Sequence, residues 1–341
     1  MSEAAEPANP TKRRTDHSES FAEGFLVVVS PQAIAEACFS APAVRAIRTQ
    51  RPQATIIVLA TESTAPLWEM VDEIDQVLSY PDGAPARKIV PVLRDSGFTF
   101  DACLAWEPSN AMTAVSRLDV PLRMGPKDVG LEKLLTVEVD PTEAPGPIKH
   151  RVRFYVRTVE KLGVHGFLPV NFRPPSRPEQ PERPRALIVP GSDFGVSAEW
   201  DLEKWIVLSQ AIIDNGSHEL YVVASPGRAE PAHELAGELT GQFRIFDEDI
   251  EDTLELIATS EVMLGVDGSL PHLAAHVDTL TITIFGPNEP HWKRPLGKKH
   301  KVIREQVPCS PCLLSQCPLD HRCLKAISIE DVLEALNECR L

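Results

Sequence analysis

The chain has 341 residues, of which 43% are hydrophobic, so it can bury two ordinary cores and we expect two domains. Its formal net charge of −15 repels phosphate backbones and anionic headgroups. This argues against nucleic acid as a partner and leaves at most peripheral membrane contact. The basic residues that would make such contact are Lys293, Arg294, Lys298, Lys299 and Lys301.

No apolar segment approaches the roughly 20 residues that span a bilayer. The first 24 residues are polar and lack the apolar stretch of a secretion signal, so we read them as a disordered tail. We therefore expect a cytoplasmic protein, and a monomer.

Apolar runs rich in β-branched residues alternate with amphipathic patterns in the first half of the chain. Such alternation predicts a parallel sheet with helical crossovers. The expected strands cover 25–30, 55–60, 76–79 and 102–106, and the expected helices lie near 33–49, 64–71, 85–94 and 110–118.

Residues 173–185 read RPPSRPEQPERPR, with five prolines among charges. Because proline interrupts helices and central strands, we place a linker there. The alternation then restarts, with strands at 186–189, 220–224, 243–245, 262–265 and 281–285 and helices near 201–214, 229–240, 252–258 and 270–277. Two doubly wound units result, and such sheets bind ligands at the carboxyl ends of their strands.

The segment Val266-Asp267-Gly268-Ser269-Leu270-Pro271-His272 lies between a strand and a helix. Ser269 suits the helix cap and Pro271 the first turn, and free N–H groups there would favour a diphosphate. Asp267 and His272 would then contact the sugar or phosphate. The simpler interpretation, which stays open, is an ordinary strand–turn–helix connection.

Two glycine-containing loops follow other strands of the same unit. Val189-Pro190-Gly191-Ser192-Asp193-Phe194-Gly195 permits close backbone approach to a phosphate. Phe285-Gly286-Pro287 by itself indicates only a turn.

In their joint order these loops resemble glycosyltransferase family nine, which includes the ADP-heptose:lipopolysaccharide heptosyltransferases. Residues 190–195 before Trp200 look like the family's Pro-Gly-Ala-Glu-Phe-Gly loop before its tryptophan. Asp267, His272, Ala274 and Ala275 match its Asp-Ser-Gly-x-x-His-x-x-Ala box. The resemblance runs from Phe25 to Leu336.

The resemblance implies an α/β protein of the GT-B fold, with two Rossmann-like domains facing a central cleft. We expect an acceptor domain over 25–172, the linker over 173–185, a donor domain over 186–325, and a helix within 326–341 that crosses back to the first domain. The implied donor-binding residues are Ser192, Asp193, Gly195, Asp267, Ser269, His272, Gly286 and Pro287.

The implied reaction is inverting transfer of a heptose-like sugar from a nucleotide sugar such as ADP-heptose to a saccharide or glycolipid acceptor of the lipopolysaccharide type, without a metal cofactor. A carboxylate deprotonates the acceptor hydroxyl. The family's Gly-Asp precedes a proline by six residues, and counting back from Pro42 gives Ala35-Glu36, so Glu36 is the candidate base. A solvated carboxylate at a helix start is the alternative.

Two further departures bear on activity. The family's basic residue before the tryptophan is replaced by Ala198-Glu199, which opposes a diphosphate unless Lys204, Arg228 or Lys293 compensates. Gly268-Ser269 reverses the family's Ser-Gly. Whether the chain is an active enzyme is therefore open, and a catalytically impaired module that binds a nucleotide sugar or a protein is the alternative. An epimerase or phosphorylase on the same architecture is a third hypothesis.

Four of the seven cysteines crowd near the C-terminus with the spacing C-x2-C-x4-C-x5-C. Compact spacing of this kind can build a structural zinc site, with reduced or buried thiols as the alternative. The candidate ligands are Cys309, Cys312, Cys317 and Cys323.

Overall fold

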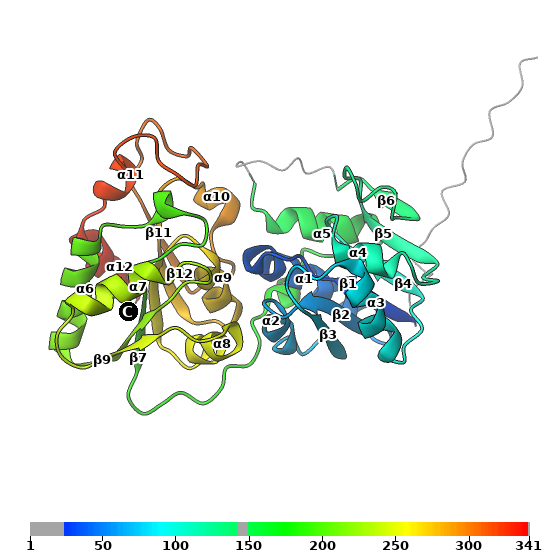
Figure 1. Cartoon of the computed structure of the whole chain (residues 1–341), viewed down its shortest axis with the longest axis horizontal. Helices are drawn as coiled ribbons and strands as arrows, with labels where there is room; N and C mark the ends of the chain where they lie inside the picture. Colours follow the sequence, from blue (N-terminus) through cyan, green and yellow to red (C-terminus); the bar gives the residue numbers. More distant parts are fainter. Residues whose placement is uncertain (1–23, 142–148, 340–341) are drawn as a thin grey trace, which may run out of the picture.

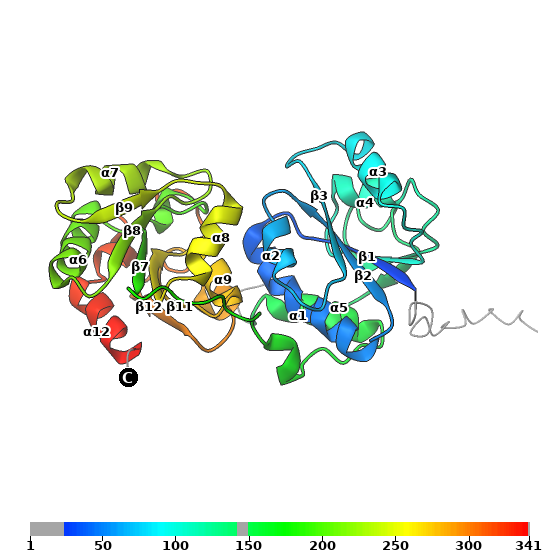
Figure 2. The ribbon, with the colours of Figure 1, turned by 90° about the horizontal axis from the view of Figure 1, so that it is seen from below.

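The computed structural model describes residues 24–141 and 149–339 (Figure 1). The tail that we expect over residues 1–24 lies, apart from Gly24, outside the described residues. The chain folds into two α/β units, each with a six-stranded sheet in which all strand pairs are parallel, and the two units stand side by side in Figures 1 and 2. This confirms the α/β class that the alternating pattern predicts.

The first sheet has the strand order β3-β2-β1-β4-β5-β6. Its strands are β1 (Phe25–Val29), β2 (Thr55–Thr61), β3 (Gln76–Tyr80), β4 (Ala102–Leu104), β5 (Leu122–Pro126) and β6 (Val137–Val139). The accompanying helices are α1 (Ile34–Gln50), α2 (Ala65–Glu69), α3 (Ala86–Asp95), α4 (Asn110–Val115), α5 (Val152–Lys161) and the 3-10 turn η2 (Pro169–Phe172).

The second sheet has the same kind of order, β12-β11-β10-β7-β8-β9. Its strands are β7 (Arg185–Val189), β8 (Glu219–Val223), β9 (Phe243–Phe246), β10 (Val262–Val266), β11 (Leu280–Phe285) and β12 (His300–Arg304). Its helices are η3 (Val196–Ala198), α6 (Leu202–Asn215), α7 (Glu230–Glu238), α8 (Ile250–Ala258), α9 (Ser269–His276), α10 (Pro290–Lys293), α11 (Arg322–Lys325) and α12 (Ile329–Cys339).

The two units meet through an apolar interface. Helix α1 packs against α9 and α2 against α8, as Figure 2 shows from below. One hydrophobic cluster runs from β1 through α1 into α8 and α9, so the core of the first unit continues into the second. Burying apolar surface on both sides of the boundary holds the units together.

The C-terminal helix differs from our expectation. We expected it to cross back to the first domain, but α12 packs against β11, β12 and α6 of the second unit, on the side away from the first (Figure 1). Val332 and Leu336 are buried there in one cluster with Trp200. The apolar face of α12 is thus satisfied within the second unit, which removes the driving force for a crossing.

No helix among the described residues is both long enough and apolar enough to cross a membrane.

Candidate active site

Glu36 lies in the first turn of α1, just beyond the carboxyl end of β1, and two cations face it. Arg151 donates from Nε to Glu36 Oε2 at 2.8 Å, and the Tyr155 hydroxyl donates to the same oxygen. Lys293, which belongs to the second unit, places Nζ 3.6 Å from Glu36 Oε1. The side chain of Glu36 is only 14% exposed. The candidate base is therefore an ordered carboxylate at the boundary between the two units, and not a solvated one.

A second carboxylate stands close to Glu36. Glu107 follows β4 and accepts from the Gln32 amide at 3.0 Å. Burial raises the pKa of Glu107, the Gln32 amide lowers it, and the negative charge of Glu36 raises it further. Sequence patterns did not indicate Glu107, because a lone glutamate after a strand carries no distinctive signal.

Asp267 lies at the carboxyl end of β10 and is almost fully buried. Desolvation raises its pKa to about 7, opposed by a hydrogen bond from the Asn288 amide and by the positive charge of Lys293. Lys293 therefore acts electrostatically on both Glu36 and Asp267. It is the cation that connects the two halves of the candidate site.

The start of α9 is occupied by a carboxylate from the neighbouring loop. Asp193 Oδ1 accepts from the Ser269 amide at 2.8 Å, and the Ser269 hydroxyl donates to Asp193 Oδ2. Ser269 is the first residue of α9 and Gly268 precedes it as the cap, so our expectation that Ser269 caps the helix is wrong. A Cβ on Gly268 would lie 2.7 Å from Asp193 Oδ1, so the Gly-Ser order is what lets Asp193 approach.

The Glu199 carboxylate is neutralised by a bidentate partner. Arg228 donates from Nε to Glu199 Oε1 at 2.7 Å and from a terminal nitrogen to Oε2 at 3.1 Å. Of Lys204, Arg228 and Lys293, the cations that we considered as compensation for the family's missing basic residue, Arg228 is the one that pairs with Glu199. Lys204 instead donates to the carbonyls of Lys325 and Ile327.

The remaining loop residues have clear packing roles. Ser192 donates to the Asp267 carbonyl at 2.5 Å, which ties two strand ends together. Gly195 has φ +137°, and a Cβ there would lie 2.5 Å from the Ser315 carbonyl oxygen. A Cβ on Gly286 would lie 2.8 Å from the Leu324 side chain, and the Pro287 carbonyl accepts from the Cys312 and Leu313 amides. Their expected contacts with a donor stay predictions.

His272 faces the first unit. Its ring meets Phe39 edge-on with 4.9 Å between the ring centroids, and its Nδ1 has no hydrogen-bond partner among the described residues. Burial lowers its pKa to about 3, so the ring is neutral near pH 7.

The four clustered cysteines are free thiols on and around the loop before α11. Within residues 24–141 and 149–339, no three Cys, His, Asp or Glu side chains are placed to hold one metal ion. The structure therefore gives the candidate zinc site no support: Cys309, Cys312 and Cys317 are half-exposed on the loop, whereas Cys323 is buried.

Comparison with known proteins gives the following similarities. Residues 166–322 match the model of "Glycosyltransferase family 9 (heptosyltransferase)". Lipopolysaccharide heptosyltransferase 2 of Escherichia coli K12 is 23% identical over 311 residues, covering 82% of this chain and 87% of the relative. Alignments with four further curated heptosyltransferases span 37–38% of their length.

Solved structures share the fold. ADP-heptose lps heptosyltransferase II of E. coli superposes with a TM-score of 0.75 at 21% identity, over 92% of this chain and 98% of that one. E. coli heptosyltransferase WaaC with ADP-2-deoxy-2-fluoro heptose gives a TM-score of 0.67 at 16% identity, over 92% and 99%. The expected GT-B fold with two Rossmann-like domains is thereby confirmed.

Proposed function

We propose, from the premise that this chain is a heptosyltransferase-like protein of the glycosyltransferase family 9 type, that it transfers a heptose-like sugar from a nucleoside-diphosphate sugar to a saccharide or lipopolysaccharide-type acceptor, with inversion. ADP-heptose is the donor that we favour, since relatives with this fold bind ADP and an ADP-heptose analogue. The observation that carries the proposal is the position of Glu36, which faces Lys293 across the boundary between the domains.

In this proposal each domain binds one of the two substrates. We propose that residues 25–172 receive the acceptor, that residues 186–325 hold the donor, and that residues 173–185 join them. Glu36 belongs to the first of these parts, and Asp267 and Lys293 belong to the second. This division places the base on the acceptor side and the cation that faces it on the donor side.

In the proposed reaction the Glu36 carboxylate takes the proton of the acceptor hydroxyl. The freed oxygen attacks the anomeric carbon, and the bond from that carbon to the diphosphate oxygen breaks with its electron pair on the leaving group. We expect Lys293, which faces Glu36 from the second domain, to offset the negative charge that develops on the diphosphate. Arg151 and Tyr155 hold the Glu36 carboxylate in one orientation, because both donate to the same oxygen.

The alternative of a non-catalytic module rests on two losses: the family's aspartate, in whose place Glu36 stands, and the family's cation beside Trp200. The Glu199–Arg228 pair weakens that argument, since the added carboxylate is neutralised and does not face the donor loop as a bare charge. We therefore favour the enzyme.

The first test is calorimetric titration of the full chain with ADP-heptose, ADP, UDP-sugars and GDP-sugars, followed by a transfer assay with ADP-heptose and a heptose-free lipopolysaccharide core. We expect ADP-heptose to bind and its sugar to be transferred. No binding by any of these nucleotides, together with no transfer, would refute the proposed function.

Glu36→Gln then tests the base against a matched neighbour, Glu107→Gln. Because general-base catalysis contributes roughly 10²- to 10⁴-fold, we expect Glu36→Gln to lower kcat by that range while donor binding persists. Glu107→Gln is expected to stay within a few-fold of the parent. Unchanged transfer in Glu36→Gln would remove Glu36 from this role, and loss only in Glu107→Gln would transfer the role to Glu107.

A further inference from the structure

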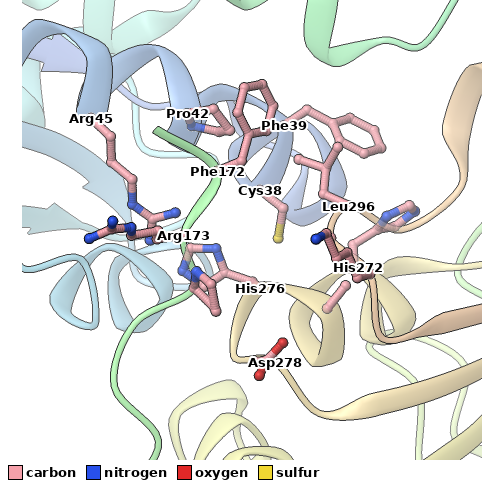
Figure 3. Close-up of a pocket in the computed structure, with 14 residues that line it drawn as sticks. Cys38, Phe39, Pro42, Arg45, Phe172, Arg173, His272, His276, Asp278 and Leu296 are labelled. Atoms are coloured by element: carbon pink, nitrogen blue, oxygen red, sulfur yellow. The ribbon is translucent and has the colours of Figure 1, made fainter. Parts of the chain in front are cut away.

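A cavity of about 230 Å³ lies between the two domains beside the start of the linker (Figure 3). Its walls come from the middle of α1, from residues 172–174, from the C-terminal half of α9 and from the loop after α10. Neither Glu36 nor Asp267 lines it. His272, an expected donor-binding residue, does line it, so the cavity adjoins the candidate active site at that ring, and its contents would contact both domains and the linker at once.

One end of the cavity is basic. Figure 3 shows Arg45, Arg173 and His276 on the same side. Arg45 is only 4% exposed and keeps one partner, Glu73, at 3.3 Å. Arg173 forms no ion pair with any described residue, which leaves its guanidinium donors open.

His276 adds an unsatisfied polar atom at this end. The residue is 7% exposed, and its Nε2 has no hydrogen-bond partner among the described residues. A buried ring nitrogen without a partner costs free energy unless a ligand or water satisfies it. Asp278, the carboxylate among the lining residues, is already neutralised by Lys299 at 2.7 Å. Because Arg45 is paired with Glu73, the excess positive charge at the cavity comes from Arg173 and Lys298, which form no ion pair with a described residue.

The cavity also has apolar lining residues. Phe39, Phe172 and Leu296 are among them, and Phe39 is fully buried. The volume exceeds the roughly 150 Å³ of an engineered apolar cavity that takes up benzene. A ring-sized apolar group therefore fits beside the basic end.

We propose that this interdomain cavity is a binding site for a small organic anion, with a carboxylate or phosphate group held by Arg45 and Arg173 and an apolar body packed on Phe39, Phe172 and Leu296. The neutral His276 ring bonds the Leu67 carbonyl through its other nitrogen, so its free Nε2 is open to accept a hydrogen bond from a hydroxyl group of the ligand or from water. The bound anion bridges α1, the linker and α9, so it stabilises the packed arrangement of the two domains. The proposal does not rest on the transfer activity, because none of its evidence comes from the active site.

Calorimetry on the full chain tests the ligand class with four probes. Benzoate and phenyl phosphate combine an anion with a ring, benzyl alcohol has the ring without the charge, and inorganic phosphate has the charge without the ring. We expect the two aromatic anions to bind and the other two to bind at least tenfold more weakly. Absence of binding by both aromatic anions, or equal binding of benzyl alcohol, would overturn the proposal.

Three variants locate the site. Arg173→Met removes an exposed cation that has no ion pair with described residues, and Ala275→Leu fills the cavity without changing its charge. Arg87→Met, at an exposed position on α3, is the matched control. We expect binding of benzoate to weaken at least tenfold in the first two variants and to stay unchanged in the third.

The melting temperature of each variant shows whether it is folded. If Ala275→Leu does not fold, Arg173→Met alone tests the location of the site. Because the Arg173 side chain is exposed, we expect this variant to fold. Benzoate binding that is the same in Arg173→Met as in Arg87→Met would place the ligand elsewhere and refute the site.

Discussion

Glu199 and Arg228 are the residues that decide whether the loop after β7 repels a diphosphate. The two hydrogen bonds that Arg228 donates to Glu199 convert an added carboxylate into a neutral pair, and they are the main reason that the pKa of Arg228 is raised. Glu199 also accepts from the Ser192 amide at 3.4 Å, so the pair reaches the loop that we expect to meet the donor. The effect of Glu199 on a bound diphosphate therefore has to be judged together with its partner Arg228.

A double-mutant cycle checks this coupling. Arg228→Met leaves Glu199 as an unpaired negative charge, so we expect the Kd for ADP, measured by calorimetry, to rise about tenfold. Glu199→Gln combined with Arg228→Met removes both charges and is expected to bind ADP nearly as well as the parent. Additive losses in the double variant would show that Arg228 acts on the ligand directly and not through Glu199.

Helix α12 is the element whose position differs most from our expectation. Weakening its packing should therefore destabilise the second unit specifically. Leu336 is buried in the cluster of the second unit. Leu336→Ala deletes buried methyl groups and leaves a cavity, so we expect a loss of about 2–4 kcal/mol in the free energy of unfolding.

Hydrogen exchange distinguishes the two possible positions of α12. We expect Leu336→Ala to lower the protection of β11, β12 and α6 and to leave β1, β2 and β4 unchanged. The exposed Glu334→Ala, two residues earlier, is the control and should change little. Weakened protection in the first sheet would support a crossing helix instead.

The sequence predicted the buried central strands and the edge strands β3 and β9, and it missed three other strands, for a physical reason. Strands β1, β2, β7 and β10 are buried on both faces and therefore read as continuous apolar runs. The patterns predicted no strand at β5, β6 or β12, because Arg, Gly and Pro interrupt β5, β6 has only three residues with Glu138 in the middle, and β12 begins with His300 and Lys301.

The candidate site was predictable only in part. Glu36, Asp267 and His272 follow strand ends or begin helices, which local patterns and the family resemblance both indicate. The residues that contact Glu36 could not be predicted from local patterns. Arg151 lies 115 residues from Glu36 in the chain, and Lys293 comes from the other domain. The Asp193 cap on α9 also depends on a contact across 76 residues, which no local pattern contains.

At the scale of the whole molecule, the interface between the domains contains three histidines that burial keeps neutral. Burial lowers the pKa of His150 to about 4 and the pKa values of His272 and His276 to about 3. Phe39 packs edge-on against both His150 and His272, at 5.2 and 4.9 Å between ring centroids. Protonation of these rings therefore places charge inside the apolar contact of α1 with α9.

The sign of the pH dependence follows from linkage. A histidine with a lowered pKa contributes stability that is complete above its unfolded value of 6.5 and is lost as the pH falls towards the folded value. Asp267 acts in the opposite direction. Its pKa is raised to about 7, so between about pH 4 and 7 the folded state binds a proton that the unfolded chain does not, and this contribution stabilises the folded state as the pH falls. The pKa of Glu107 is also raised and that of His300 is also lowered, so four histidines oppose two carboxyls, and a net loss of stability in acid follows.

We therefore expect the free energy of unfolding, measured in urea, to fall between pH 6.5 and 5, and His276→Gln to reduce that slope by on the order of 1 kcal/mol per pH unit. The comparison uses slopes, so a uniform loss of stability in the variant does not affect it. His233→Gln removes an exposed ring paired with Asp247 and is the control that should keep the parental slope. If His276→Gln and His233→Gln follow the parent equally from pH 6.5 to 5, the buried ring does not titrate with unfolding, and acid acts on the interface through other groups.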